Sequence, residues 1–196
     1  MVSRVFCILV SHEFGIRDDG LAEIFMRYGA VDVYYPPSGG ARAALVVAAD
    51  PVFATVVDER VAWLGQVAPY EPGSFFRREL PATRTVLNGA EGLDLLIVDG
   101  YVDLDPDGRP GLGALLHDEM DVPVIGVAKT AFRSATHAAT VHRGAATRPL
   151  YVTAAGLSIE SAARLVASMA GPYRLPDALR RVDRLSRGGD QPAAAG

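Results

Sequence analysis

The stretch from residue 95 to residue 129 constrains the fold of this chain more than any other. It opens with an apolar run, residues 95–98, that predicts a buried strand and ends abruptly at Asp99. A helical pattern follows, and a second apolar run, residues 122–127, then leads to Lys129. Two buried strands joined by a helix predict a parallel βαβ unit, with Asp99 and Lys129 at neighbouring strand ends. Ligands of open α/β sheets bind outside the carboxyl ends of the strands, so this edge is the first candidate for a site.

Three short strand-like runs precede this unit. Residues 31–35 alternate apolar and polar side chains, and residues 41–49 and 55–67 follow after turn residues, which predicts an antiparallel meander. A helix is expected within residues 74–88. Ser74 is a candidate N-cap, whereas Pro81 favours a start at or after Leu80.

Beyond Lys129 we expect a hairpin of residues 139–142 with residues 150–153. A helix capped by Ser158 and a last helix from Pro176 follow. The complete order, three antiparallel strands and then parallel strands with helices between them, predicts a ribonuclease-H-like α/β sheet flanked by helices.

The length of 196 residues suits one cored domain. We divide the chain into an N-terminal flanking segment (1–29), this domain (30–187) and a disordered tail (188–196). The single cysteine, Cys7, excludes an intrachain disulfide and a cysteine metal cluster. No apolar run approaches the ~20 residues that span a membrane, so we expect a cytoplasmic monomer without membrane contact.

Charge is distributed unevenly along the chain. Residues 1–121 hold 9 basic and 19 acidic side chains, whereas residues 122–196 hold 10 basic and 4 acidic ones. The total of −4 excludes a polybasic nucleic-acid binder. An acidic part beside a basic part suits metal ions on one side and phosphates on the other. The alternative is two solvated faces of opposite sign.

Three carboxylates converge if the predicted sheet is correct. The first strand, which carries Asp32, then lies beside the strand that ends at Asp99, and Glu79 reaches the same edge from the intervening helix. Three such groups repel one another unless divalent cations lie between them, and Mg²⁺ accepts a few carboxylates, water and phosphate oxygens as ligands. Lys129 could bind phosphate there as a point charge. Taken singly, each acid could equally be a solvated or capping carboxylate.

Several motifs, in order and at matching spacings, resemble those of the endonuclease V family over about residues 30–188. The matching segments are Val31-Asp32-Val33 with Tyr35, Pro69-Tyr70-Glu71-Pro72-Gly73, Phe76-Arg77-Arg78-Glu79, Val98-Asp99-Gly100, Gly111-Leu112-Gly113, Val122–Lys129, Arg148–Val152 and Tyr173–Asp177.

The resemblance implies a repair enzyme that hydrolyses a DNA phosphodiester 3′ to a deaminated base, deoxyinosine, with Mg²⁺ or Mn²⁺. Its DNA would be a deaminated or distorted duplex, with single strands as an alternative. Asp32, Glu79 and Asp99 fall on the family's metal-binding carboxylates, and Lys129 falls on its lysine near the scissile phosphate.

The resemblance also implies DNA-binding positions. Tyr70, with Pro72 beside it, falls on the wedge that enters the duplex at the lesion, where unstacking costs a few kcal/mol and least at a mispaired base. Gly111 and Gly113 fall where the family builds its tight base pocket.

Two departures from the family pattern bear on activity and specificity. The family histidine that follows the strand at residues 150–152 is missing, and Tyr101-Val102-Asp103 stands in place of the residues that usually follow the Asp-Gly pair in the family. His137, His142 and Glu160 are weaker candidates for the role of this missing histidine. A non-catalytic or weakly active nucleic-acid-binding homologue is therefore the alternative function, and a small-molecule-binding α/β domain is a third. The preference for DNA or RNA stays open.

Overall fold

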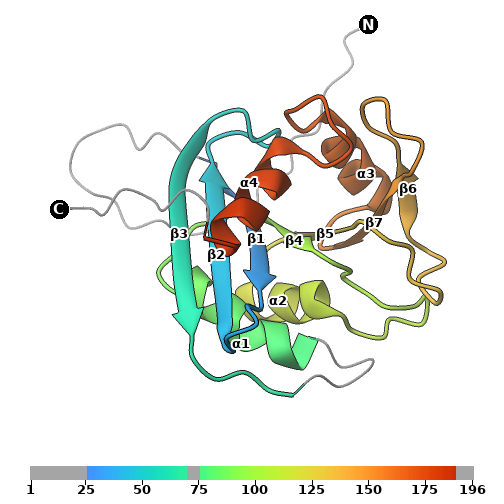
Figure 1. Cartoon of the computed structure of the whole chain (residues 1–196). Helices are drawn as coiled ribbons and strands as arrows, with labels where there is room; N and C mark the ends of the chain where they lie inside the picture. Colours follow the sequence, from blue (N-terminus) through green and yellow to red (C-terminus); the bar gives the residue numbers. More distant parts are fainter. Residues whose placement is uncertain (1–25, 70–75, 189–196) are drawn as a thin grey trace, which may run out of the picture.

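A computed structural model describes residues 26–69 and 76–188 of the chain. Within these residues, seven strands form one sheet in the order β3-β2-β1-β4-β5-β7-β6, and four helices cover it (Figure 1). The strands are β1 (Tyr28–Tyr34), β2 (Ala41–Ala48), β3 (Val56–Leu64), β4 (Leu95–Asp99), β5 (Val124–Ala128), β6 (Ala139–Val141) and β7 (Leu150–Ala155). The helices are α1 (Phe76–Leu87), α2 (Leu112–Met120), α3 (Ile159–Ser168) and α4 (Asp177–Ser186).

The sheet is mixed, as the ribonuclease-H-like order predicts. β1, β2 and β3 pair antiparallel, whereas β1, β4 and β5 run parallel to one another. β7 pairs antiparallel with β5 and forms the expected hairpin with β6, so that Ala139 lies opposite Val152. The fold predicted from the sequence is therefore confirmed, and the carboxyl ends of β1, β4 and β5 meet at one edge.

Each face of the sheet buries its own apolar core. The core under α1 and α2 contains Leu45, Leu96 and Val98, whereas the core under α3 and α4 contains Ile97 and Ile125. Side chains alternate between the two faces along each strand, so the central strands are apolar throughout, as strands covered on both faces must be. Figure 1 shows α4 on the near face across β1 and β2, with α1 and α2 behind.

Helix α1 differs from the sequence expectation. It begins at Phe76 and contains Pro81, so the predicted start at or after Leu80 is wrong. Pro81 removes one backbone donor, but Ala82 and Val86 bury the helix against the sheet, and this packing outweighs the local cost. The predicted N-cap, Ser74, lies outside the described residues.

Helices α3 and α4 begin close to the predicted positions. Ser158 caps α3, because its Oγ accepts a hydrogen bond from the Ser161 amide. Helix α4 begins at Asp177, directly after Pro176. Among the described residues, no helix has the length and apolar character needed to cross a membrane.

A glycine in β5 allows the loop after β4 to cross the sheet. A Cβ atom built on Gly126 would lie 2.7 Å from the Gly100 carbonyl oxygen, the Val102 nitrogen and the Thr153 Oγ1. The buried Val102 amide donates to that Thr153 hydroxyl, at 2.8 Å. Only a residue without a side chain lets this loop lie so close to β5, so Gly126 helps to position the segment that follows Asp99.

We expect Gly126→Ala to destabilise the protein by about 1–3 kcal/mol, because its methyl group overpacks against backbone that cannot move independently. Denaturant unfolding followed by circular dichroism measures this change. Gly65→Ala is the matched control, since the nearest atom to its added Cβ is 3.9 Å away. Equal stability of the two variants would contradict the assigned role of Gly126.

Candidate active site

Two carboxylates stand at the ends of neighbouring parallel strands. Val31 of β1 lies opposite Val98 of β4. The next residues on the two strands, Asp32 and Asp99, are therefore also at neighbouring positions. Two residues earlier on these strands, Ala30 and Ile97 are buried under α3 and α4, so Asp32 and Asp99 face that side. Burial raises the pKa of Asp32, and the charge of Asp99 raises it further. The predicted proximity of these two acids is therefore present in the structure.

Glu79 joins them from α1, on the other side of the sheet edge. The side chain is partly buried, and its pKa is raised to about 8, first by burial and then by the charges of Asp32 and Asp99. A carboxyl group with this pKa keeps its proton at neutral pH when no cation is nearby. The three predicted acids thus interact electrostatically around one place.

Lys129 forms an ion pair with one of these carboxylates. Its Nζ lies 2.5 Å from the Asp99 Oδ2, and the two side chains are 38% and 20% exposed. Burial opposes the charged ammonium, but Asp99, and less strongly Asp32, raise the pKa of Lys129 overall. The lysine predicted as a phosphate contact therefore neutralises part of the acidic charge, and it is still open to solvent.

A fourth acid, Asp183 of α4, belongs to the same group although the sequence analysis did not single it out. Its negative charge raises the pKa of Asp32 and favours the charged form of Lys129. The fully buried Ser186, one turn on, has its Oγ 3.0 Å from the Asp32 Oδ2 and 2.8 Å from the Asp183 carbonyl oxygen. The last turn of α4 is thus tied to β1.

We call Asp32, Glu79, Asp99 and Asp183 the acidic cluster. One sequence signal could have indicated Asp183, which is the only acid of the arginine-rich α4 beyond its first turn. No histidine of the described residues, and not Glu160, is among the charges that shift the pKa values within the cluster. Glu160 and His142 are exposed, and His137 acts instead on Asp103.

The donor chemistry of the acidic cluster suits a hard divalent cation. Carboxylate oxygens are the ligands that Mg²⁺ accepts. Burial, and then the neighbouring carboxylates, raise the pKa values of Asp32 and Glu79, so a cation there would favour the ionised forms. Within the described residues, no three acidic, histidine or cysteine side chains are close enough to share an ion as they stand. Mg²⁺ is commonly bound by one or two carboxylates together with water and phosphate oxygens, so two of these acids are enough to hold it.

Tyr101 joins the two loops that leave the site. Its hydroxyl donates to the Thr130 carbonyl at 2.8 Å and accepts from the Phe132 amide at 2.9 Å. The rings of Tyr101 and Phe132 are 6.0 Å apart. The residue that departs from the family pattern after Asp99 thus holds the segment that follows Lys129.

The structure places the two predicted pocket glycines inside the protein. A Cβ on Gly111 would lie 2.6 Å from the Tyr101 carbonyl oxygen, and one on Gly113 would lie 2.7 Å from the Val102 Cγ2. Both glycines therefore let α2 begin directly against the loop after Asp99, and their role in base binding stays a prediction. The predicted wedge, Tyr70 and Pro72, lies outside the described residues.

Comparisons with known proteins agree with this architecture. A family model for endonuclease V matches residues 15–148. The endonuclease V of Methanopyrus kandleri is 34% identical over 179 residues, which cover 81% of this chain and 76% of that protein. The solved endonuclease V of Streptomyces avermitilis has a TM-score of 0.69 and 28% identity, and the match covers 82% of this chain and 79% of that one.

A further solved structure shares the fold at lower identity. The endonuclease V of Ciona intestinalis, in complex with a DNA that contains an inosine followed by a ribo-adenosine, has a TM-score of 0.70 and 19% identity. The match covers 82% of this chain and 83% of that one.

We expect Glu79→Gln to stabilise the metal-free protein at pH 8 by roughly 1–3 kcal/mol. The pKa of Glu79 rises on folding from 4.5 to about 8, so the folded state holds a proton that the unfolded state has lost between these values. The wild type therefore loses stability as pH rises through this window, and the glutamine variant lacks this loss. Urea unfolding at several pH values in EDTA measures it, and a difference that is constant from pH 5 to pH 8 would contradict it.

Proposed function

Because this chain belongs to the endonuclease V family, we propose that it is a metal-dependent endonuclease that hydrolyses a DNA phosphodiester 3′ to a deaminated base, deoxyinosine, in DNA repair. The observation that carries the proposal is the meeting of Asp32, Glu79 and Asp99 with Lys129 at one edge of the sheet. The Ciona protein of the same fold, solved with inosine-containing DNA, supports nucleic acid as the partner.

The acidic cluster would hold the cation, Mg²⁺ or Mn²⁺. A cation bound there supplies Lewis-acid chemistry, which means that it favours ionisation of water and stabilises charge on the phosphate oxygens. Asp32 and Asp99 stand on strands and are therefore rigidly placed, and Ser186 further orients Asp32 through its hydroxyl. Glu79 comes from a helix and holds a proton near neutral pH until positive charge arrives.

Lys129 provides the positive charge for the substrate. Its side chain is more than a third exposed and, among the carboxylates of residues 26–69 and 76–188, touches Asp99 alone, so a phosphate oxygen can replace that contact without opening the fold. Arg174 fixes the main chain at this point, because its guanidinium donates to the carbonyl oxygens of Lys129 and Pro149. This anchoring keeps the ammonium within reach of the acidic cluster.

A nicking assay with an inosine-containing duplex tests the proposal. We expect a single nick 3′ to the inosine with Mg²⁺ or Mn²⁺, none in EDTA, and loss of activity by about 10³-fold or more in Asp99→Ala, because the variant lacks a group that would bind the cation. Asp107→Ala removes an exposed acid of the neighbouring loop and should keep full activity. Folded protein that binds the duplex but never nicks it would instead identify a non-catalytic homologue.

The role of Lys129 is tested separately. We expect Lys129→Met to lower the single-turnover nicking rate by roughly 10²-fold, since a positive charge beside the developing phosphate charge is removed. Lys129→Arg should restore part of that rate. Circular dichroism checks that both variants fold. A rate in Lys129→Met equal to that of the wild type would exclude the lysine from the reaction.

A further inference from the structure

A row of three side chains crosses the first three strands next to the acidic cluster. Tyr34 of β1 lies opposite Arg42 of β2, and Arg42 lies opposite Trp63 of β3. Cross-strand partners share a face of the sheet, and Tyr34 is two residues beyond Asp32 on the same face. Two strand residues advance about 7 Å, so the row begins about 7 Å from the candidate catalytic carboxylate.

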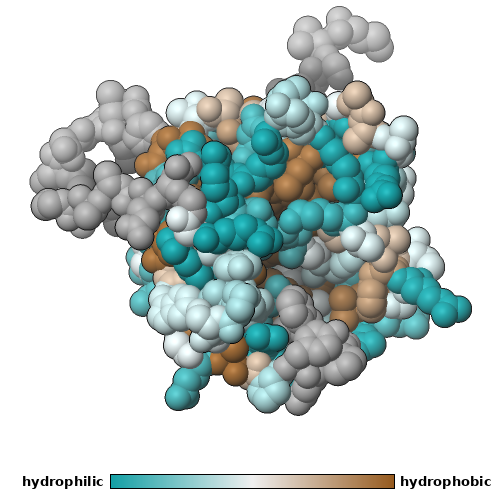
Figure 2. All heavy atoms as spheres, viewed as in Figure 1, coloured by the Kyte–Doolittle hydropathy of each residue, from teal (hydrophilic) through white to brown (hydrophobic). Residues whose placement is uncertain are grey.

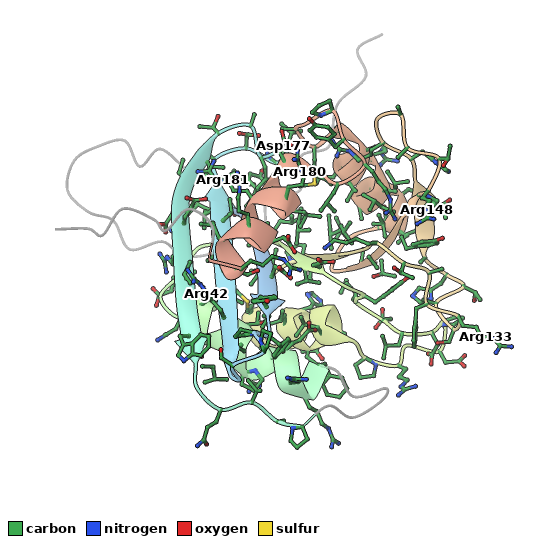
Figure 3. All side chains as sticks on the ribbon, viewed as in Figure 1. Arg42, Arg133, Arg148, Asp177, Arg180 and Arg181 are labelled. Carbon is green, nitrogen blue, oxygen red and sulfur yellow. The ribbon has the colours of Figure 1, made fainter. Side chains whose placement is uncertain are left out.

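The row lies beyond the last turn of α4 and is open to solvent at its outer end. Arg187 covers the Tyr34 ring at 4.7 Å and also pairs with Asp183 of the acidic cluster at 3.2 Å. Figure 3 shows Arg42 on β2 and Arg180 and Arg181 on α4 on the same side of the molecule. Figure 2 shows hydrophilic residues over α4 on this face. The row therefore continues from the acidic cluster along an accessible surface.

Trp63 is held in place but remains exposed. Its side chain belongs to the few large apolar groups on the surface of the described residues, with an exposed fraction of 55%. A Cβ on Gly40 would lie 2.7 Å from the Trp63 Cζ2, so the ring rests on the backbone of the turn before β2. The indole thus has one supported side and an open area large enough to stack against a flat ligand.

One hydrogen-bond donor of the Arg42 side chain lacks an acceptor. Its Nε is buried, and it has no hydrogen-bond partner within the described residues. A buried donor without a partner is unfavourable, and a small movement of the side chain toward an anionic acceptor would satisfy it. A phosphate matches the planar guanidinium, which can donate two parallel hydrogen bonds to its oxygens.

We propose that Tyr34, Arg42, Trp63 and Arg187 form a platform that binds unpaired nucleotides of the strand flanking the scissile phosphodiester. The proposal rests on the proposed function, because that function brings a nucleic-acid strand to the acidic cluster. Bases stack on Trp63 and Tyr34, whereas the arginines contact the phosphates. Three strands spaced ~4.8 Å apart give a row of about 10 Å, which matches about three stacked nucleotides at ~3.4 Å each.

The charges favour a nucleic acid over another protein or a second copy of this chain. The platform carries two arginines, and among the described residues only Asp183 forms an ion pair with either of them. A two-fold contact between copies would bring the same arginines together, which like-charge repulsion opposes. Aromatic rings alternating with arginines are the usual components of single-strand binding surfaces.

The chain contains one tryptophan, so its emission reports on the platform alone. We expect unlabelled oligo-dT, added in EDTA at low salt, to quench this emission as the bases stack on the ring. Binding of the oligonucleotide without any change in emission would overturn the proposal, and so would a lack of binding. An emission change caused by protein concentration alone would assign the surface to self-association and would equally overturn it.

Variants then measure the contribution of each group by fluorescence anisotropy of labelled oligo-dT. Trp63→Ala should weaken binding about tenfold, since stacking is sequence-tolerant and strong. Arg42→Gln should weaken it about three- to tenfold and lower the salt slope by about one. Val57→Ala, on the same strand, and Arg164→Gln, on α3, are matched exposed controls that should leave affinity unchanged. Equal affinities of all four variants would overturn the proposal.

These measurements are made without metal, so they stand apart from the nicking assay. If the protein nicks inosine-containing DNA but oligo-dT leaves the tryptophan emission unchanged, the platform alone is refuted. Quenching by oligo-dT without nicking under any metal would refute the proposed function and leave a nucleic-acid-binding surface.

Discussion

Repulsion among carboxylates held at one edge of the sheet is the constraint on which the rest of this structure depends. Parallel pairing of β1 with β4 brings Asp32 and Asp99 together, and α1 and α4 add Glu79 and Asp183. A fold tolerates such a group only if protons, cations or hydrogen-bond donors compensate its charge. Asp32 and Glu79 retain their protons more readily than usual, as their raised pKa values indicate. Lys129 adds a positive charge through its ion pair with Asp99, and the Ser186 hydroxyl forms a hydrogen bond with Asp32.

The surrounding packing serves the same edge. Gly126 lets the loop after Asp99 lie on β5, and the Thr153 hydroxyl fixes that loop through the Val102 amide. Tyr101 then holds the segment after Lys129. The two strand ends with opposite charges are therefore connected by hydrogen bonds and close contacts.

Much of this architecture follows from sequence patterns, and the exceptions have a physical cause. Alternation and apolar runs predict the strands, and the order of elements predicts that Asp32 and Asp99 are neighbours, because strand order determines which carboxyl ends meet. Such patterns do not predict that Asp183 belongs to the site, since its position depends on how α4 docks against β1 rather than on any local pattern. The start of α1 differs from the sequence prediction for a related reason, because burial of Ala82 and Val86 outweighs the local cost of Pro81.

The hydrogen bond between Ser186 and Asp32 joins residues that are 154 positions apart. Contacts of such long sequence separation form late, because the intervening chain must first be ordered. During synthesis, β1 leaves the ribosome long before α4, and domains fold as their chains are completed. An unfinished chain therefore has Asp32 without its last helix, so the site is assembled only when synthesis of the domain is almost complete. Premature termination anywhere before α4 yields a product that lacks Asp183 and Ser186 together.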